Sequence, residues 1–240
     1  MTHSLFISDL HLCQTRPHIT RLFLTFLQQQ VRAAESLYIL GDLFEYWAGD
    51  DDLEDEHHQQ VVNALHGLSE VKVYLMHGNR DLLLGERFAQ ACNATLLPDP
   101  ILMSLHGRLT LLTHGDLLCT DDVDYQAFRK QVHDPLWQQA FLAQPLSERK
   151  NQIAGYRSRS EQEKSYKSEA IMDVNAEAVA DMVRQYQYPS LLIHGHTHRM
   201  GKHAMSIDGH SCERIVLGDW YDSGSYLSVN AQECVMLPWN

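Results

Sequence analysis

The sequence predicts an α/β fold built around a largely parallel sheet, and two features support this. Short apolar runs at 5–8, 37–40 and 71–76 alternate with stretches in which apolar residues recur at helical spacing. Such alternation favours a parallel sheet. Each run is also followed at once by polar residues that can bind a ligand. Because ligands of such sheets lie at the carboxyl ends of the strands, we expect the functional site at that edge.

The first part of the chain supplies three strand–helix pairs. The strands at 5–8, 37–40 and 71–76 are followed by helical patterns over 19–31, 61–68 and about 82–91. The acidic stretch 50–56 is expected to be a solvated loop, because charge runs are usually exposed.

The later part of the chain is richer in strands. Residues 101–105 and 109–113 alternate around a turn and predict a hairpin. Further strands are expected at 191–193, 202–207, 214–217, 226–229 and 235–237. Between these two sets, residues 121–173 break the pattern and predict a helical insertion, or lid, within a single domain of residues 1–240. Basic residues gather in the second part of this insertion.

Composition narrows the class of protein. A chain of 240 residues that is 44% hydrophobic is long enough to bury one sizeable core. The formal net charge of −12 argues against a nucleic-acid partner. Five cysteines without a C-x-x-C pair indicate a reduced, cytosolic protein. No apolar run approaches the roughly 18 residues of a transmembrane helix, and the first residues do not resemble a signal peptide.

Seven side chains that can bind metal ions follow five of the predicted strands. His196 and His198 come two apart after the strand at 191–193, and Asp9 and His11 repeat this spacing after the first strand. In extended chain, residues two apart point the same way, so each pair aims at one place. The other candidates are Asp42, Asn79 and His114.

The chemistry of these seven residues indicates a pair of metal ions. All of them offer oxygen or nitrogen and none offers sulfur, which favours Mn²⁺, Fe²⁺, Zn²⁺ or Mg²⁺ over a thiolate zinc site. Seven ligands are too many for one tetrahedral ion, but they suit two ions that share a carboxylate. Two ions about 3.5–4 Å apart activate water and clamp a phosphoryl group for in-line displacement.

At this point the chain resembles the calcineurin-like metallophosphoesterase family. The resemblance rests on five ordered blocks, at 9–11, 41–42, 78–81, 114–115 and 195–198. It implies a fold of two packed mixed β-sheets flanked by helices. It also implies one ion held by Asp9, His11, Asp42 and His198, and a second held by Asp42, Asn79, His114 and His196, with Asp42 as the bridge. Asp81 is expected to orient a ligand histidine.

Arg80 departs from the pattern of many family members, which carry a histidine directly after the asparagine. An arginine cannot donate a proton at neutral pH, but it can grip phosphate oxygens through two N–H groups. Arg80 therefore favours cleavage of a diphosphate, whose leaving group needs no proton, over cleavage of an alkyl phosphate.

Longer stretches resemble one branch of this family, which acts in lipid A biosynthesis in Gram-negative bacteria. These stretches are 40–45, 78–81, 118–122, 125–129 and 170–175. The resemblance implies that water attacks the α-phosphorus of UDP-2,3-diacylglucosamine and yields UMP and 2,3-diacylglucosamine 1-phosphate. It implies two Mn²⁺ ions per chain and a peripheral position on the cytoplasmic side of the inner membrane, with no obligate protein partner.

The resemblance also assigns roles to residues. The implied catalytic residues are Asp42, Asn79, Arg80 and His196. The implied substrate contacts are Asn79, Arg80, Asp122, Ser160, Lys164, Lys167 and His196, although Lys164 stands where the branch has an asparagine. Trp137 and Phe141 share a helical face that would hold acyl chains, unless this face only packs on the core.

Two alternatives remain open. One is another phosphoesterase of the same fold, such as a dinucleoside polyphosphatase or a protein phosphatase. The other is a non-catalytic scaffold, which would be expected to lose metal ligands, whereas all seven positions are filled in this chain.

Overall fold

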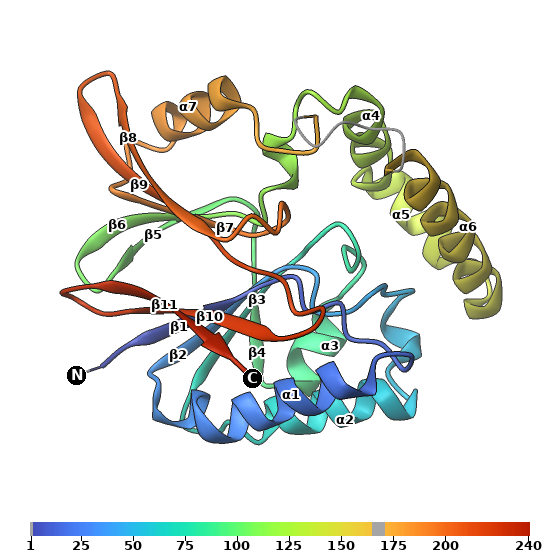
Figure 1. Ribbon diagram of the computed structural model, residues 1–240. Helices are drawn as coiled ribbons and strands as arrows, with labels where there is room; N and C mark the ends of the chain where they lie inside the picture. Colours follow the sequence, from blue (N-terminus) through green and yellow to red (C-terminus); the bar gives the residue numbers. More distant parts are fainter. Residues whose placement is uncertain (1, 165–170) are drawn as a thin grey trace.

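The computed structural model describes the backbone of residues 2–164 and 171–240, and the side chains of residues 2–160 and 171–240. Two mixed β-sheets pack face to face, and helices cover both outer faces (Figure 1). The expected α/β fold of two packed mixed sheets flanked by helices is confirmed.

The first sheet has six strands in the order β11-β10-β1-β2-β3-β4. Its parallel part comprises β1 (Ser4–Ile7), β2 (Ser36–Leu40), β3 (Lys72–Met76) and β4 (Ala94–Leu97). The strands β10 (Gly224–Val229) and β11 (Cys234–Trp239) extend it beyond β1 through antiparallel pairs. Its outer face is covered by α1 (Pro17–Gln29), α2 (Glu56–His66) and α3 (Glu86–Ala91). The parallel strands β1 and β2 are buried at every residue, which explains their uninterrupted apolar sequences.

The second sheet has five strands in the order β5-β6-β7-β9-β8. They are β5 (Ile101–Leu105), β6 (Arg108–Leu112), β7 (Leu191–His194), β8 (Gly201–Ile207) and β9 (His210–Val216). The strands β6, β7 and β9 run parallel, and β5 forms the expected hairpin with β6. The helix α7 (Ala176–Gln185) packs on the outer face (Figure 1). Between the sheets, the Tyr38 ring stacks on Phe6 and Tyr74, with centroids 4.5 and 4.7 Å apart.

Three helices, α4 (Val123–Val132), α5 (Pro135–Leu142) and α6 (Leu146–Lys164), lie within the predicted insertion. They stand beside the ends of the sheets, at the edge toward which β1, β2 and β3 run (Figure 1). Asp122 and Asp134 cap α4 and α5 by accepting hydrogen bonds from backbone N–H groups of the first turn. No helix in the described part of the chain is long and apolar enough to cross a membrane.

The structure corrects the prediction for part of the acidic stretch 50–56, while Asp51, Glu54 and Glu56 are exposed as predicted. Asp50–Asp52 forms a short 3-10 helix, and Asp52 is buried. Asp50 accepts hydrogen bonds from the indole of Trp47 and from the backbone N–H of Gly85. The Asp50 carboxylate is therefore a structural acceptor rather than a solvated charge, because it satisfies N–H groups that would otherwise lack a partner.

The predicted helix at 82–91 is shorter than expected. It begins only at Glu86, because Leu84 N–H bonds back to the Asp81 carbonyl in a turn. The elements β4 and α7 were not predicted. The first is a short, incompletely buried edge strand, and the second is a ten-residue helix that begins after the cap residue Asn175.

Candidate metal centre

The seven predicted ligands come together at the carboxyl edge of both sheets. Five of them adopt a left-handed backbone conformation, with φ of 56° at Asp9, 49° at His11, 53° at Asp42, 67° at His196 and 58° at His198. This conformation is uncommon for residues other than glycine and clusters at functional sites. It turns the chain sharply after each strand, so that the side chains face the same space.

Glycines allow the strand ends to approach closely. A Cβ atom on Gly195 would collide with the Asp9 carboxylate and the Ser8 hydroxyl, and one on Gly78 would collide with Asp42. Gly41, at φ 92°, leaves room for His114 Nδ1. Each of these positions therefore requires glycine, because any side chain would displace a predicted ligand.

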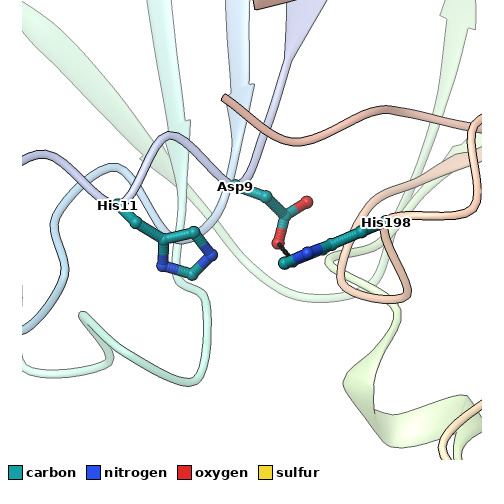
Figure 2. A group of neighbouring side chains, drawn as sticks. All are labelled: Asp9, His11 and His198. Atoms are coloured by element: carbon teal, nitrogen blue, oxygen red, sulfur yellow. Dashed lines mark ion pairs between the residues drawn. The ribbon is translucent and has the colours of Figure 1, made fainter. Parts of the chain in front are cut away.

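The first group of ligand atoms comes from Asp9, His11 and His198, and Figure 2 shows their side chains converging. Their ligand atoms lie within 4.8 Å of one another. His198 Nε2 lies 3.3 Å from Asp9 Oδ1, and the imidazole centroids of His11 and His198 are 5.5 Å apart. Residues from opposite ends of the sequence thus share one site.

The second group adds Asp42, which lies between the two sets of donors. Ligand atoms of Asp9, Asp42 and His114 also lie within 4.8 Å of one another. Asp42 Oδ2 is 3.8 Å from His11 Nε2 and 3.9 Å from His114 Nε2, so one carboxylate oxygen faces a histidine of each group. This is the position that a bridging carboxylate requires.

Asn79 and His196 complete the second group. Asn79 Oδ1 lies 3.2 Å from His114 Nε2 and 2.9 Å from His196 Nδ1. The His114 and His196 rings meet edge to face, with centroids 5.1 Å apart. The structure thus brings all seven predicted ligands together.

Several buried polar atoms in the site lack hydrogen-bond partners among the described residues. They are Asp9 Oδ1 and both ring nitrogens of His11. Burying such atoms without a partner is costly, and a divalent cation would satisfy atoms of both side chains. The donor set and these atoms fit the divalent metal that the fold family implies.

Electrostatics also distinguish the histidines. Burial, helped by the nearby His114, lowers the pKa of His196 to about 3. Burial opposes a charged His198 as well, but Asp219 and Asp9 raise its pKa to about 10. A cation that binds there replaces such protons, so metal binding releases them.

Neighbouring side chains hold the ligands in place. Asp219 Oδ2 lies 3.0 Å from His198 Nδ1, whereas Asp9 faces the other ring nitrogen. The Ser8 hydroxyl donates to Asp9 Oδ2 over 2.6 Å. Such outer contacts fix the ring orientation and tautomer of metal-binding histidines.

The expected role of Asp81 is wrong. Within the described residues its carboxylate accepts no hydrogen bond from a histidine. It accepts backbone N–H groups instead, from Leu43 at 2.8 Å, Gly78 at 2.9 Å and Asp42 at 3.2 Å. It thereby ties together the turns after β2 and β3, which carry Asp42 and Asn79.

The predicted substrate residues are only partly covered by the structure. Arg80 is half-buried at the edge of the site, and its backbone N–H donates to Asp42 Oδ1 over 2.8 Å. Asp122 caps α4, and Ser160 is half-buried on α6. The side chain of Lys164 and the whole of Lys167 lie outside the described residues.

Tyr125 is a site residue to which the sequence assigned no role. Its ring stacks on His196, with centroids 5.9 Å apart, and its hydroxyl donates to Asp116 Oδ2 over 2.6 Å. The same oxygen accepts from Arg129 Nε at 2.7 Å. Asp116 therefore ties α4 to the metal centre. The 125–129 motif marked this segment, but nothing in it indicated contact with a histidine.

Comparisons with known proteins identify the family of this chain. The family model for the calcineurin-like phosphoesterases matches residues 2–200. A protein of Aromatoleum aromaticum named UDP-2,3-diacylglucosamine hydrolase is 53% identical over 93% of this chain and 91% of its own length. Proteins of the same name from Escherichia coli and Cellvibrio japonicus are 48% and 46% identical, over 98% and 99% of both chains.

Among solved structures, a dimetal phosphatase from Danio rerio superposes with a TM-score of 0.53. The match covers 100% of this chain and 99% of the phosphatase at 12% sequence identity, so the likeness concerns the fold.

Proposed function

Because this chain belongs to the calcineurin-like phosphoesterase family, we propose that it hydrolyses UDP-2,3-diacylglucosamine to UMP and 2,3-diacylglucosamine 1-phosphate, a step of lipid A synthesis. Relatives named for that substrate match almost the whole chain, including the insertion. The observation that carries the proposal is the meeting of seven oxygen and nitrogen donors beside Arg80.

We further propose that the seven residues hold two Mn²⁺ ions. Asp9, His11, Asp42 and His198 would hold one, and Asp42, Asn79, His114 and His196 the other. When bound, such ions lower the pKa of water and neutralise charge on a phosphoryl group. Of the hard and borderline ions that suit this donor set, Mn²⁺ is the one implied by the resemblance.

The chain's own residues then bind and orient the diphosphate. The Arg80 guanidinium can grip phosphate oxygens through two N–H groups, and its backbone N–H fixes it beside Asp42. It cannot supply a proton at neutral pH, so the group that leaves must be stable as an anion. A sugar 1-phosphate meets this requirement, and an alkoxide does not.

The insertion is proposed to hold the acyl chains. Trp137 and Phe141 stack on each other with centroids 4.8 Å apart, and Phe141 is buried. Val123 and Leu136 of the same insertion are 71% and 76% exposed. These apolar side chains support a peripheral position on the cytoplasmic face of the inner membrane, where a diacylated substrate is accessible.

The test is hydrolysis of UDP-2,3-diacylglucosamine in ¹⁸O-water by the Mn²⁺-loaded protein, followed by mass analysis of both products. Label in UMP is expected, since attack on the α-phosphorus places the new oxygen there. Label in the sugar phosphate would contradict the proposed direction of attack. Turnover of a dinucleoside polyphosphate without turnover of the lipid substrate would select the alternative phosphoesterase.

A further inference from the structure

The Glu45 carboxylate lies beside the metal centre, and the guanidinium groups of three arginines from different parts of the fold lie close to it. Arg16 Nη2 lies 2.8 Å from its Oε2, and Arg157 Nη2 lies 2.7 Å from its Oε1. Arg80 Nη1 lies 3.7 Å from Oε1. These arginines come from the loop before α1, from α6 of the insertion, and from the turn after β3. One carboxylate therefore links the catalytic edge to the insertion.

This cluster carries more positive than negative charge, because three guanidinium groups face one carboxylate. Glu45 is 9% exposed, so water screens these charges only weakly. Within the described residues, Arg16 Nη1 and Arg157 Nε are buried and have no hydrogen-bond partner. These two nitrogens are closed to solvent, so it is the spare positive charge of the three guanidinium groups that suits the oxygens of a polyanion.

Two further ion pairs join α6 to the same segment of the core. Arg149 pairs with Asp51, and Lys150 Nζ lies 2.7 Å from Asp52 Oδ1. Both pairs hold the first turns of α6, and neither involves a predicted ligand or Arg80. Among the ion pairs of the described residues, only the Arg157–Glu45 pair connects α6 with the metal centre, because Glu45 also faces Arg80.

We propose that Glu45 is a positioning residue that fixes Arg80 toward the substrate diphosphate and docks Arg157 of α6 beside it. This inference rests on the proposed function, in which Arg80 grips that diphosphate. Without the negative charge, the guanidinium groups of Arg80 and Arg157 repel each other, and both lose their preferred positions. The loss affects mainly substrate binding, because Glu45 holds the arginines and does not touch the reacting atoms.

The experiment compares Glu45→Gln with Asp52→Asn in the full, Mn²⁺-loaded chain. Each change removes one negative charge that holds α6, but only the first affects Arg80. We expect KM for UDP-2,3-diacylglucosamine to rise about tenfold in Glu45→Gln, as for a lost charge-assisted contact, with kcat within about threefold of the unchanged chain. KM in Asp52→Asn should stay within about twofold, as for a partly exposed ion pair.

A second variant covers the case in which Glu45→Gln does not fold. Arg157→Gln removes the Arg157–Glu45 ion pair by changing its more exposed partner, which the fold tolerates more easily than a change at Glu45. We expect this variant to raise KM as well. If Glu45→Gln does not fold, an unchanged KM in Arg157→Gln overturns the proposal. If Glu45→Gln folds, the double variant should raise KM by less than the combined effect of the two single changes. Fully additive effects on KM would overturn the proposal.

Two results would overturn the role of Glu45 while the unchanged chain remains active on the lipid substrate. The first is an equal KM in Glu45→Gln and Asp52→Asn. The second is loss of bound manganese in Glu45→Gln, measured by elemental analysis. Such a loss would show that Glu45 acts on the predicted ligand His11, because His11 Nδ1 lies 4.0 Å from Glu45 Oε2. If the unchanged chain does not cleave the lipid substrate, the proposed function fails. The same KM comparison with a dinucleoside polyphosphate then decides on Glu45.

Discussion

At the scale of single residues, Asp219 controls the orientation of one predicted ligand. It accepts from His198 Nδ1, which leaves Nε2 to face Asp9. We expect Asp219→Asn to weaken Mn²⁺ binding about 10- to 100-fold, because such outer carboxylates fix the ring and increase its basicity. Titration calorimetry measures the effect.

The matched control for that prediction is Asp208→Asn. Asp208 also carries an ion pair, with Arg184, but it lies in the turn between β8 and β9, away from the seven ligands. Its loss should leave Mn²⁺ affinity unchanged. Equal affinities in both variants would show that Asp219 does not act on the metal.

The candidate ligands were predictable because each sits in a short motif directly after a strand. Glu45, Asp219 and Tyr125 could not be assigned in this way. Glu45 and Tyr125 lie in the 40–45 and 125–129 stretches, but these stretches do not show that the two residues contact Arg157 and His196, which are far along the chain. Asp219 lies in no motif. The role of Asp81 was predicted wrongly for a related reason, since its hydrogen-bond partners are backbone N–H groups, which leave no trace in the sequence.

At the scale of elements, α2 depends on its cap. Asp55 Oδ1 accepts from the backbone N–H groups of His57 at 2.9 Å and His58 at 3.4 Å. We expect Asp55→Ala to destabilise the fold by about 1 kcal/mol and to lower Tm by roughly 2–4 °C, with kcat unchanged. Asp55→Asn keeps the acceptor and should retain most of the stability. Calorimetry checks both, and an unaltered Tm in Asp55→Ala would contradict the role of the cap.

The long periodic elements were predictable, while the short ones were not. The strands β1, β2 and β3 are largely apolar runs in the interior of the first sheet, so burial accounts for their pattern. Asp50, Asp52 and Asp55 were wrongly expected to be solvated, because they serve as helix caps and ion-pair partners. These roles depend on the arrangement of α2, α3 and α6. Three basic residues of the insertion, Arg149, Lys150 and Arg157, are likewise paired with core acids.

At the scale of the whole molecule, bound metal should stabilise the folded state. A ligand present at 100 times its Kd stabilises by about 2.7 kcal/mol, which corresponds to roughly 5–10 °C in Tm for a chain of this size. We therefore expect removal of metal by a chelator to lower Tm by that amount, measured by differential scanning calorimetry, and added Mn²⁺ to restore it.

The control is His198→Ala, which removes one donor at a position that is only partly buried. Its Tm should respond much less to Mn²⁺. If neither the chelator nor added Mn²⁺ changes the Tm of the unchanged chain, the protein does not bind a stabilising metal ion.

The donors are divided between the two sheets. Asp9, His11, Asp42 and Asn79 follow strands of the first, and His114, His196 and His198 follow strands of the second. During synthesis, the three histidines that follow strands of the second sheet are not all present until residue 198 has left the ribosome. By then most of the 240 residues have been synthesised. A nascent chain therefore completes this donor set only near the end of translation, and binding of a divalent metal then requires that the two sheets have come together.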